Sequence, residues 1–200
     1  MSKAPTRIQQ RNRAAILTAG LDVFSQFGFR GTTLDQIADA AGLSKPNLLY
    51  YFPSKEAIHT ALLERLLETW LDPLKALDEN GDPIKEIMAY AQRKLALSRD
   101  FPRESRLFAN EILQGAPHIA DYLSGELRKL VDEKVVILRK WQDSGQIASI
   151  DPHHLIFSIW SLTQHYAAFD VQVRAVMPDG DTYAGAATYL DHVIRQILQP

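Results

Sequence analysis

Apolar residues recur at three- and four-residue spacing along almost the whole chain, and no segment alternates as a half-buried strand would. Leu17, Leu21 and Phe24 mark the first such helix. The same spacing predicts helices at 8–27, 34–41, 45–51, 54–78, 83–99, 103–113, 119–145, 151–175 and 182–198. We therefore expect an all-α fold of about nine helices, in which a three-helix N-terminal domain precedes a larger helical bundle.

Residues that begin and end helices agree with these boundaries. A side-chain oxygen before a helix can accept a free backbone N–H, and proline in the first turn loses no hydrogen bond. Gly28 is placed to end the first helix in a left-handed conformation. The expected start signals are the Thr33–Gln36 capping box, Ser44, Ser54, Asp82-Pro83 and Asp151-Pro152.

Charge is divided unequally along the chain. Residues 1–55 hold seven basic and three acidic side chains, a net +4, so the remainder carries −6 in a chain whose total is −2. Such segregation favours an N-terminal part that meets a polyanion. We expect a DNA-binding domain at 1–53, with a mobile basic tail at 1–10, and an effector-binding and dimerisation domain at 54–200.

Several functions are disfavoured. The chain has no cysteine, so thiol catalysis and Cys-ligated metals are excluded, and a reducing cytoplasm is the expected location. It shows no apolar run of the ~20 residues that would span a membrane, and no signal peptide is expected. Motifs of hydrolases, nucleotide-binding enzymes and metalloproteases are absent. His153 and His154 point about 100° apart on a helix and make a poor metal pair. We expect no enzyme, no cofactor and no metal.

The segment from Thr33 to Tyr51 has the form of a helix-turn-helix. Ala38 is small where two helices would cross, and Gly42 can take the positive φ of a tight turn. Leu43 and Leu48 are expected to bury between the helices and to set the second helix at an angle suited to the major groove.

The second helix would then present its N-terminal residues to DNA. Lys45 can donate to guanine or phosphate, and Asn47 can pair with an adenine edge, whereas Phe52 is expected in the core. Tyrosine hydroxyls, threonines and a lysine at a helix start suit phosphate oxygens. The candidate DNA contacts are Thr32, Thr33, Ser44, Lys45, Pro46, Asn47, Tyr50, Tyr51 and Lys55.

The segments FSQFGFRGTTLDQIADAAGLSK and YYFPSKEAI resemble the N-terminal domain of TetR-family regulators over about residues 12–60. This resemblance implies an operator-binding homodimer. Family members usually carry tyrosine where this chain has Leu49, and whether Tyr50 takes over the phosphate contact stays open.

A narrower resemblance spans nearly the whole chain. Pyrimidine-utilisation regulators of that family carry segments similar to four in this chain, which are KPNLLYYFPSKEA, SRDFPRESRLF, IDPHHLIFSIW and TQHYAAFDVQV. It implies uracil or thymine as effector and control of pyrimidine catabolism, with repression expected. The alternatives are another small apolar or amide-bearing ligand and, more remotely, a helical ligand-binding protein that does not bind DNA.

The residues themselves suit a planar, neutral ligand. Trp160 and Gln164 are four apart and share a helix face, so that an indole wall adjoins an amide able to pair with an imide edge. The candidate ligand contacts are Trp70, Lys94, Ser98, Arg106, Asn110, Trp160 and Gln164.

Dimerisation is expected through the two most apolar helices, 151–175 and 182–198. Gly185, Ala186 and Ala187 would permit close approach of a partner helix. A two-fold dimer would present its recognition helices about one DNA turn (~34 Å) apart to a palindromic operator. Ligand binding would act through helix 54–78, which begins beside the recognition helix.

Overall fold

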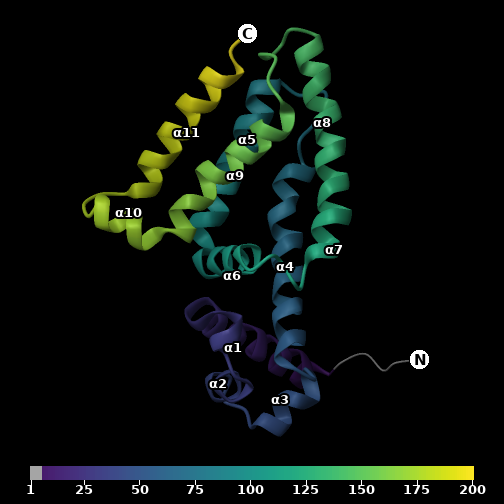
Figure 1. The fold of residues 1–200 in the computed structure, drawn as a ribbon, viewed down its shortest axis with the longest axis vertical. Helices are drawn as coiled ribbons and strands as arrows, with labels where there is room; N and C mark the ends of the chain where they lie inside the picture. Colours follow the sequence, from purple (N-terminus) through teal and green to yellow (C-terminus); the bar gives the residue numbers. More distant parts are fainter. Residues whose placement is uncertain (1–5) are drawn as a thin grey trace. The chain divides into compact units, whose positions relative to one another are not determined.

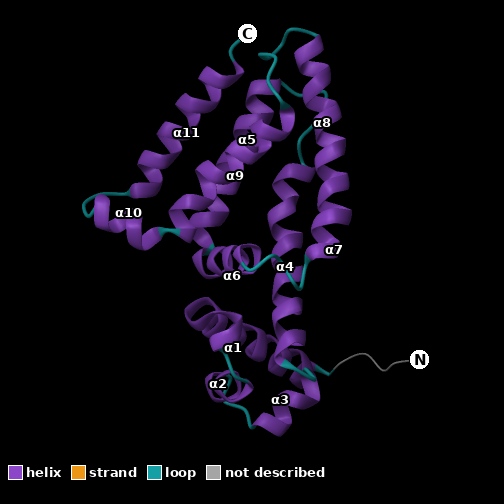
Figure 2. Ribbon diagram, viewed as in Figure 1, coloured by secondary structure: helices purple, strands orange, loops and turns teal. Residues whose placement is uncertain are grey.

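The computed structural model describes residues 6–200, and in this range the chain forms helices and no strand (Figure 2). The expectation of an all-α fold is confirmed. The helices form two compact units. The first contains the chain up to Leu67 together with Arg106–Ile119, and the second contains Glu68–Ser105 and Ala120–Pro200. The chain therefore returns to the first unit after it has begun the second.

The first unit is built on α1 (Arg7–Gly31), α2 (Leu34–Ala40) and α3 (Lys45–Tyr51) (Figure 1). The expected capping box at Thr33 and the expected cap at Ser44 are both present. The unit's core holds Ile16, Phe24, Ile37 and Leu48, all fully buried. Burial of each such side chain contributes about 1.5–3 kcal/mol, which fixes the three helices against one another.

Two long helices belong to both units. The first part of α4 (Lys55–Lys75) lies in the first unit and its remainder in the second. Likewise α6 (Pro102–Leu113) begins in the second unit and continues in the first. The expected cap of α4 is present, because the Ser54 hydroxyl accepts the backbone N–H of Ala57 at 3.2 Å.

The N-terminal helix differs from the expectation at both ends. It begins at Arg7, because Thr6 and Gln9 form a capping box, so residues 7–10 belong to a helix rather than to a mobile tail. Residues 1–5 of the expected tail lie outside the described residues. Gly28 does adopt a positive φ of 68°, but it produces a kink, and the helix continues for one more turn to Gly31.

The second unit adds further helices around an apolar core. They are α5 (Pro83–Asp100), α7 (Ala120–Tyr122), a π-helical turn η1 (Leu123–Leu127), α8 (Arg128–Asp143), α9 (Pro152–Ala168), α10 (Asp170–Val176) and α11 (Thr182–Leu198). Asp82 and Asp151 cap α5 and α9, with proline in the first turn of each, as expected. Helix α5 packs against both α9 and α11, and Ile87, Ile156 and Ile194 lie in the shared core.

Two predicted helices are interrupted. The segment 119–145 is divided among α7, η1 and α8. The segment 151–175 breaks at Phe169, whose φ of −119° and ψ of 33° lie outside the helical range, and it resumes as α10. Apolar spacing continues through both interruptions, so periodicity alone gives no sign of them.

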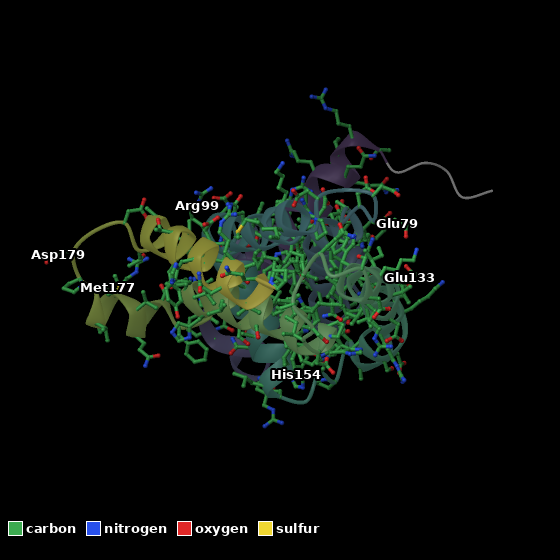
Figure 3. All side chains as sticks on the ribbon, turned by 90° about the horizontal axis from the view of Figure 1, so that it is seen from above. Glu79, Arg99, Glu133, His154, Met177 and Asp179 are labelled. Carbon is green, nitrogen blue, oxygen red and sulfur yellow. The ribbon has the colours of Figure 1, made fainter. Side chains whose placement is uncertain are left out.

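The second unit contains a short connection between α10 and α11. The connection between α10 and α11 includes Met177 and Asp179, which Figure 3 labels at the edge of this unit, and Met177 is half exposed. No helix among the described residues is long and apolar enough to cross a membrane.

Candidate DNA-binding and effector sites

The helix-turn-helix has most of the packing that its sequence predicts, although Leu43 is half-buried rather than buried. Gly42 takes a φ of 67° in the turn, and the N–H of Leu43 donates to the carbonyl of Ala38 at 2.9 Å. Ala38 and Leu48 are buried between the helices. These contacts hold α2 and α3 at a fixed angle, which is what a reading helix requires.

The N-terminal end of α3 is exposed to solvent. Ser44, Lys45, Pro46 and Asn47 are all exposed, and the Ser44 hydroxyl accepts the N–H of Asn47 at 3.4 Å. The ammonium of Lys45 lies 3.0 Å from a carboxylate oxygen of Asp35 on α2. Both partners are exposed, so this ion pair contributes little to stability and can exchange for a phosphate or a base.

The two tyrosines of α3 are anchored to α1. Tyr50 is 70% exposed, and its hydroxyl accepts the side-chain amide of Gln9 at 3.2 Å. The hydroxyl of Tyr51 accepts the amide of Asn12 at 3.0 Å. Each hydroxyl keeps its own hydrogen for a further acceptor such as a phosphate oxygen. Phe52 is buried, as expected, beneath the Arg13 guanidinium at 4.2 Å from the ring centroid.

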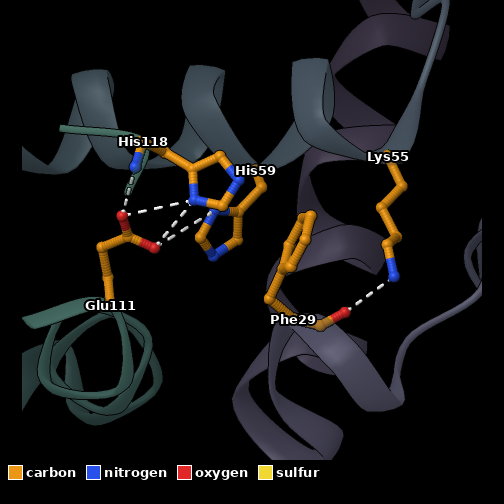
Figure 4. Close-up of polar contacts among 5 residues, drawn as sticks. All are labelled: Phe29, Lys55, His59, Glu111 and His118. Atoms are coloured by element: carbon orange, nitrogen blue, oxygen red, sulfur yellow. Dashed lines mark hydrogen bonds and ion pairs between the residues drawn. The ribbon is translucent and has the colours of Figure 1, made fainter. Parts of the chain in front are cut away.

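Lys55 and Thr32 are engaged within the protein. The Lys55 ammonium donates to the carbonyl of Phe29 at 2.9 Å (Figure 4) and lies 4.5 Å from the Phe29 ring centroid. It also donates to the carbonyl of Thr32 at 2.8 Å. Thr32 is buried, and its hydroxyl donates to the carbonyl of Gly28 at 2.8 Å. Lys55 thus caps the end of α1, with one ammonium hydrogen left for another acceptor. Thr33 is exposed at the start of α2.

A second set of polar side chains lies inside the second unit. Lys94 on α5 is buried, with its ammonium 4.5 Å from the ring centroid of Trp70. Burial lowers the pKa of Lys94 to about 8. Ser98, one turn further along α5, is also buried, and its backbone carbonyl accepts the hydroxyl of Tyr183 at 3.2 Å.

Helix α9 contributes to the same interior through Trp160. The indole N–H of Trp160 donates to the hydroxyl of Tyr90 at 2.6 Å, and burial raises the pKa of that hydroxyl. Gln164 lies one turn further along α9 and is half-buried. Tyr90, Lys94 and Ser98 are spaced four apart and share one face of α5. That spacing is a sequence signal that would have added Tyr90 to the candidates.

The other candidate ligand contacts lie on α6 and α9. Trp160 also lines a pocket of about 310 Å³ with Phe157, Leu123 and Val131. Arg106 and Asn110 are half-buried on the part of α6 that belongs to the first unit. The structure therefore shows two separate contacts among these residues. The Lys94 ammonium lies over the Trp70 ring, and the Trp160 indole N–H donates to the Tyr90 hydroxyl.

Two family models together match most of the chain. Residues 16–62 match the family model described as bacterial regulatory proteins, tetR family. Residues 63–200 match the model described as YcdC-like protein, C-terminal region. The two matches meet within α4, between residues 62 and 63.

Individual relatives cover most of the chain. The HTH-type transcriptional regulator RutR of Escherichia coli strain K12 is 54% identical over 171 residues, which are 86% of this chain and 81% of that protein. The HTH-type transcriptional repressor NicS of Pseudomonas putida is 31% identical over 150 residues, 72% of this chain and 68% of that protein.

A solved structure has the same fold. AibR, crystallised in complex with isovaleryl coenzyme A and operator DNA, is 19% identical, with a TM-score of 0.75 over 94% of this chain and 99% of that one. The chain belongs to the TetR family of bacterial helix-turn-helix transcriptional regulators.

Proposed function

We propose that this regulator binds a palindromic operator as a homodimer and that uracil or thymine, held in the second unit, changes its affinity for DNA. The observation that carries the effector part is the buried Lys94 against Trp70, beside the polar face formed with Tyr90 and Ser98. The DNA part is supported by the exposed end of α3. Because such a protein acts on chromosomal DNA, the proposal places it in the cytoplasm.

The recognition helix would read DNA through its first residues. Asn47 offers an amide that matches an adenine edge, and Lys45 offers a cation for guanine or phosphate. Thr33, Tyr50 and Tyr51 would contact phosphates on either side. The other candidates around them, Ser44, Pro46, Thr32 and Lys55, would shape and support this surface.

A planar pyrimidine suits the interior of the second unit. The Trp70 indole offers a flat apolar wall, and Lys94 offers N–H donors for a ring carbonyl. An amide such as Gln164 can donate to a second carbonyl and accept the ring N–H. The resemblance to pyrimidine-utilisation regulators suggests that the planar ligand is uracil or thymine. Arg106 and Asn110, the other two expected contacts, belong to the first unit and form no part of this proposed site.

Dimerisation would cover apolar side chains that the single chain leaves exposed. Phe157 on α9 is 45% exposed and Tyr189 on α11 is 54% exposed. Gly185 is exposed, and a side chain placed there would meet open space within the chain. Exposed apolar side chains and an exposed glycine on the expected interface segments, 151–175 and 182–198, are typical of a homodimer interface.

The effector proposal is tested by isothermal titration of the full-length protein with uracil and with thymine. Binding of one base per chain is expected, and Lys94→Met and Gln164→Ala should each weaken it by about tenfold, the loss of one hydrogen bond of about 1–2 kcal/mol. Arg93→Met, on the same helix, is the matched control. Absence of binding by both bases, with binding of another amide-bearing ring, would move the proposal to that ligand.

The DNA proposal is tested by anisotropy titration with operator sequences selected from random duplexes. Lys45→Ala should weaken binding on every duplex and should reduce the slope of log K against log salt by about 1, if its ammonium meets a phosphate. Asn47→Ala should instead weaken binding mainly on the selected sequence. A wild-type protein that enriches no sequence would support the alternative of a helical ligand-binding protein.

No step of this function requires catalysis. The named relatives are transcriptional regulators. A ligand can shift an equilibrium between two conformations of different DNA affinity if it binds the two conformations with different affinity. Helix α4 carries Trp70 in the second unit and begins at Lys55 in the first, so it is the element through which we expect the effector to act.

A further inference from the structure

Three side chains with metal-binding atoms meet inside the first unit. His59 on α4, Glu111 on α6 and His118 just after α6 place one ligand atom each within 4.8 Å of one another (Figure 4). His59 and Glu111 are buried, and His118 is 16% exposed at its side chain. Among residues 6–200 this is the one such group of three.

The spacing of these atoms suits a small divalent ion. One oxygen of Glu111 lies 3.0 Å from Nδ1 of His118 and 3.8 Å from Nδ1 of His59. Four ligands at 2.0–2.2 Å from zinc stand about 3.3–3.6 Å apart in a tetrahedron. The two observed distances lie on either side of that range, and all three ligand atoms lie within 4.8 Å of one another, so side-chain shifts of up to about 1 Å would bring them to ligand positions.

His59 supplies an independent observation. Its Nδ1 is the buried side-chain nitrogen or oxygen that lacks a hydrogen-bond partner within the described part of the chain. A buried polar atom without a partner is costly, and a native structure rarely leaves one. This nitrogen faces the Glu111 oxygen that also lies beside His118. An ion between the two atoms would serve as a partner for the nitrogen and for the oxygen.

The surroundings fix the three ligands. The backbone N–H of His118 donates to Glu111 at 2.7 Å, which holds the carboxylate beside the imidazole. The rings of Phe24 and Phe29 lie 4.8 and 4.9 Å from that of His59, between centroids, and form an apolar wall. The partial exposure of His118 leaves a path for the ion and a fourth position for water.

We propose that His59, Glu111 and His118 form a binding site for a divalent transition metal, with zinc as the ion of choice. Two imidazoles and one carboxylate suit zinc, whereas calcium and magnesium prefer oxygen ligands alone. The ion would take the place at Nδ1 where His118 otherwise meets Glu111, and the ring hydrogen of the neutral imidazole would lie on Nε2.

Such an ion would stabilise the unit that carries the helix-turn-helix. It would join α4, α6 and the segment after α6 at one point. Phe29 lies between His59 and Lys55, and Lys55 binds the carbonyls that lead into α2. Metal occupancy would thus be felt at the end of α1 and the beginning of α2.

The experiment measures zinc binding by full-length protein purified without a histidine tag and stripped with a chelator. Competition with a chromophoric chelator should give one zinc per chain. His118→Ala and Glu111→Gln should each lower the affinity by at least about tenfold, because loss of even an outer-shell partner costs that much. His192→Ala, at an exposed histidine on α11, should leave the affinity unchanged.

Thermal unfolding and cobalt absorption give two readouts that are independent of the chelator competition. Added zinc should raise the Tm of wild type and of His192→Ala but not of Glu111→Gln. Cobalt bound in the same place should show the visible bands of a four-coordinate nitrogen and oxygen site. Absence of stoichiometric zinc binding by wild type, or binding that persists at full strength in both ligand variants, would overturn the proposal.

Discussion

Replacing Lys94 with methionine removes a charge that the folded chain holds in an apolar interior. Burial lowers the pKa of Lys94 from 10.5 to about 8, and Lys94 is 7% exposed, so solvent screens the charge little. Between these two pKa values the unfolded chain holds a proton that the folded chain has released. The free energy of unfolding therefore rises with pH across this window.

The size of the effect follows from the two pKa values. The difference between the pKa of Lys94 in the unfolded and in the folded chain corresponds to about 3 kcal/mol in the free energy of unfolding, at about 1.36 kcal/mol for each pKa unit. Between pH 7 and pH 10 the wild type should gain about 2.5 kcal/mol relative to Lys94→Met, which has no group to titrate at this position. All other titrating groups are common to the two proteins and cancel in the comparison.

The assay is urea unfolding of both proteins at pH 7, 8, 9 and 10, at one fixed protein concentration. Lys85→Met serves as the control, because Lys85 lies on the same helix with its side chain 84% exposed. A difference between wild type and Lys94→Met that stays constant from pH 7 to pH 10 would refute the argument that burial destabilises the charge.

Three further changes test other parts of the structure. Trp160→Phe removes the donor to the buried hydroxyl of Tyr90, and urea unfolding should show a loss of about 1–3 kcal/mol; an unchanged midpoint would contradict that hydrogen bond. Thr33→Ala removes the cap of α2 and should cost about 1 kcal/mol in the same assay, whereas Thr33→Ser should cost much less. Phe157→Asp should convert the proposed dimer to a species with the mass of one chain in light scattering, and a mass that does not change would place the interface elsewhere.

Local signals in the sequence predicted much of the fold. The caps at Thr33, Ser44 and Asp151 depend on residues two or three positions away, so the sequence displays them directly. The break at Phe169 is different, because apolar spacing runs through it and the departure from helical angles depends on packing. The extra turn after Gly28 is not a local signal either, because Gly28 leaves the helical range as expected but the chain then returns to helix as far as Gly31.

The candidate sites likewise combine features that the sequence predicts with features that only the tertiary structure shows. The exposed end of α3 follows from the helix-turn-helix pattern, and the structure places Lys45 and Asn47 on it. The sequence could not indicate that Lys55 caps α1, because its acceptors, Phe29 and Thr32, are distant in the chain. His59 and Glu111 are similarly remote from each other, and only the tertiary fold brings them together.

The most direct test of the account is the operator affinity of the wild-type protein measured with and without saturating uracil or thymine. An anisotropy titration of one selected operator, at constant salt, should show at least about a fivefold change in Kd with one of the two bases, the lower end of typical coupling between sites. The same base should leave the Kd of Lys94→Met much less affected. An operator Kd that is identical with and without each base, at concentrations that saturate the protein, would contradict the claim that a pyrimidine in the second unit controls DNA binding.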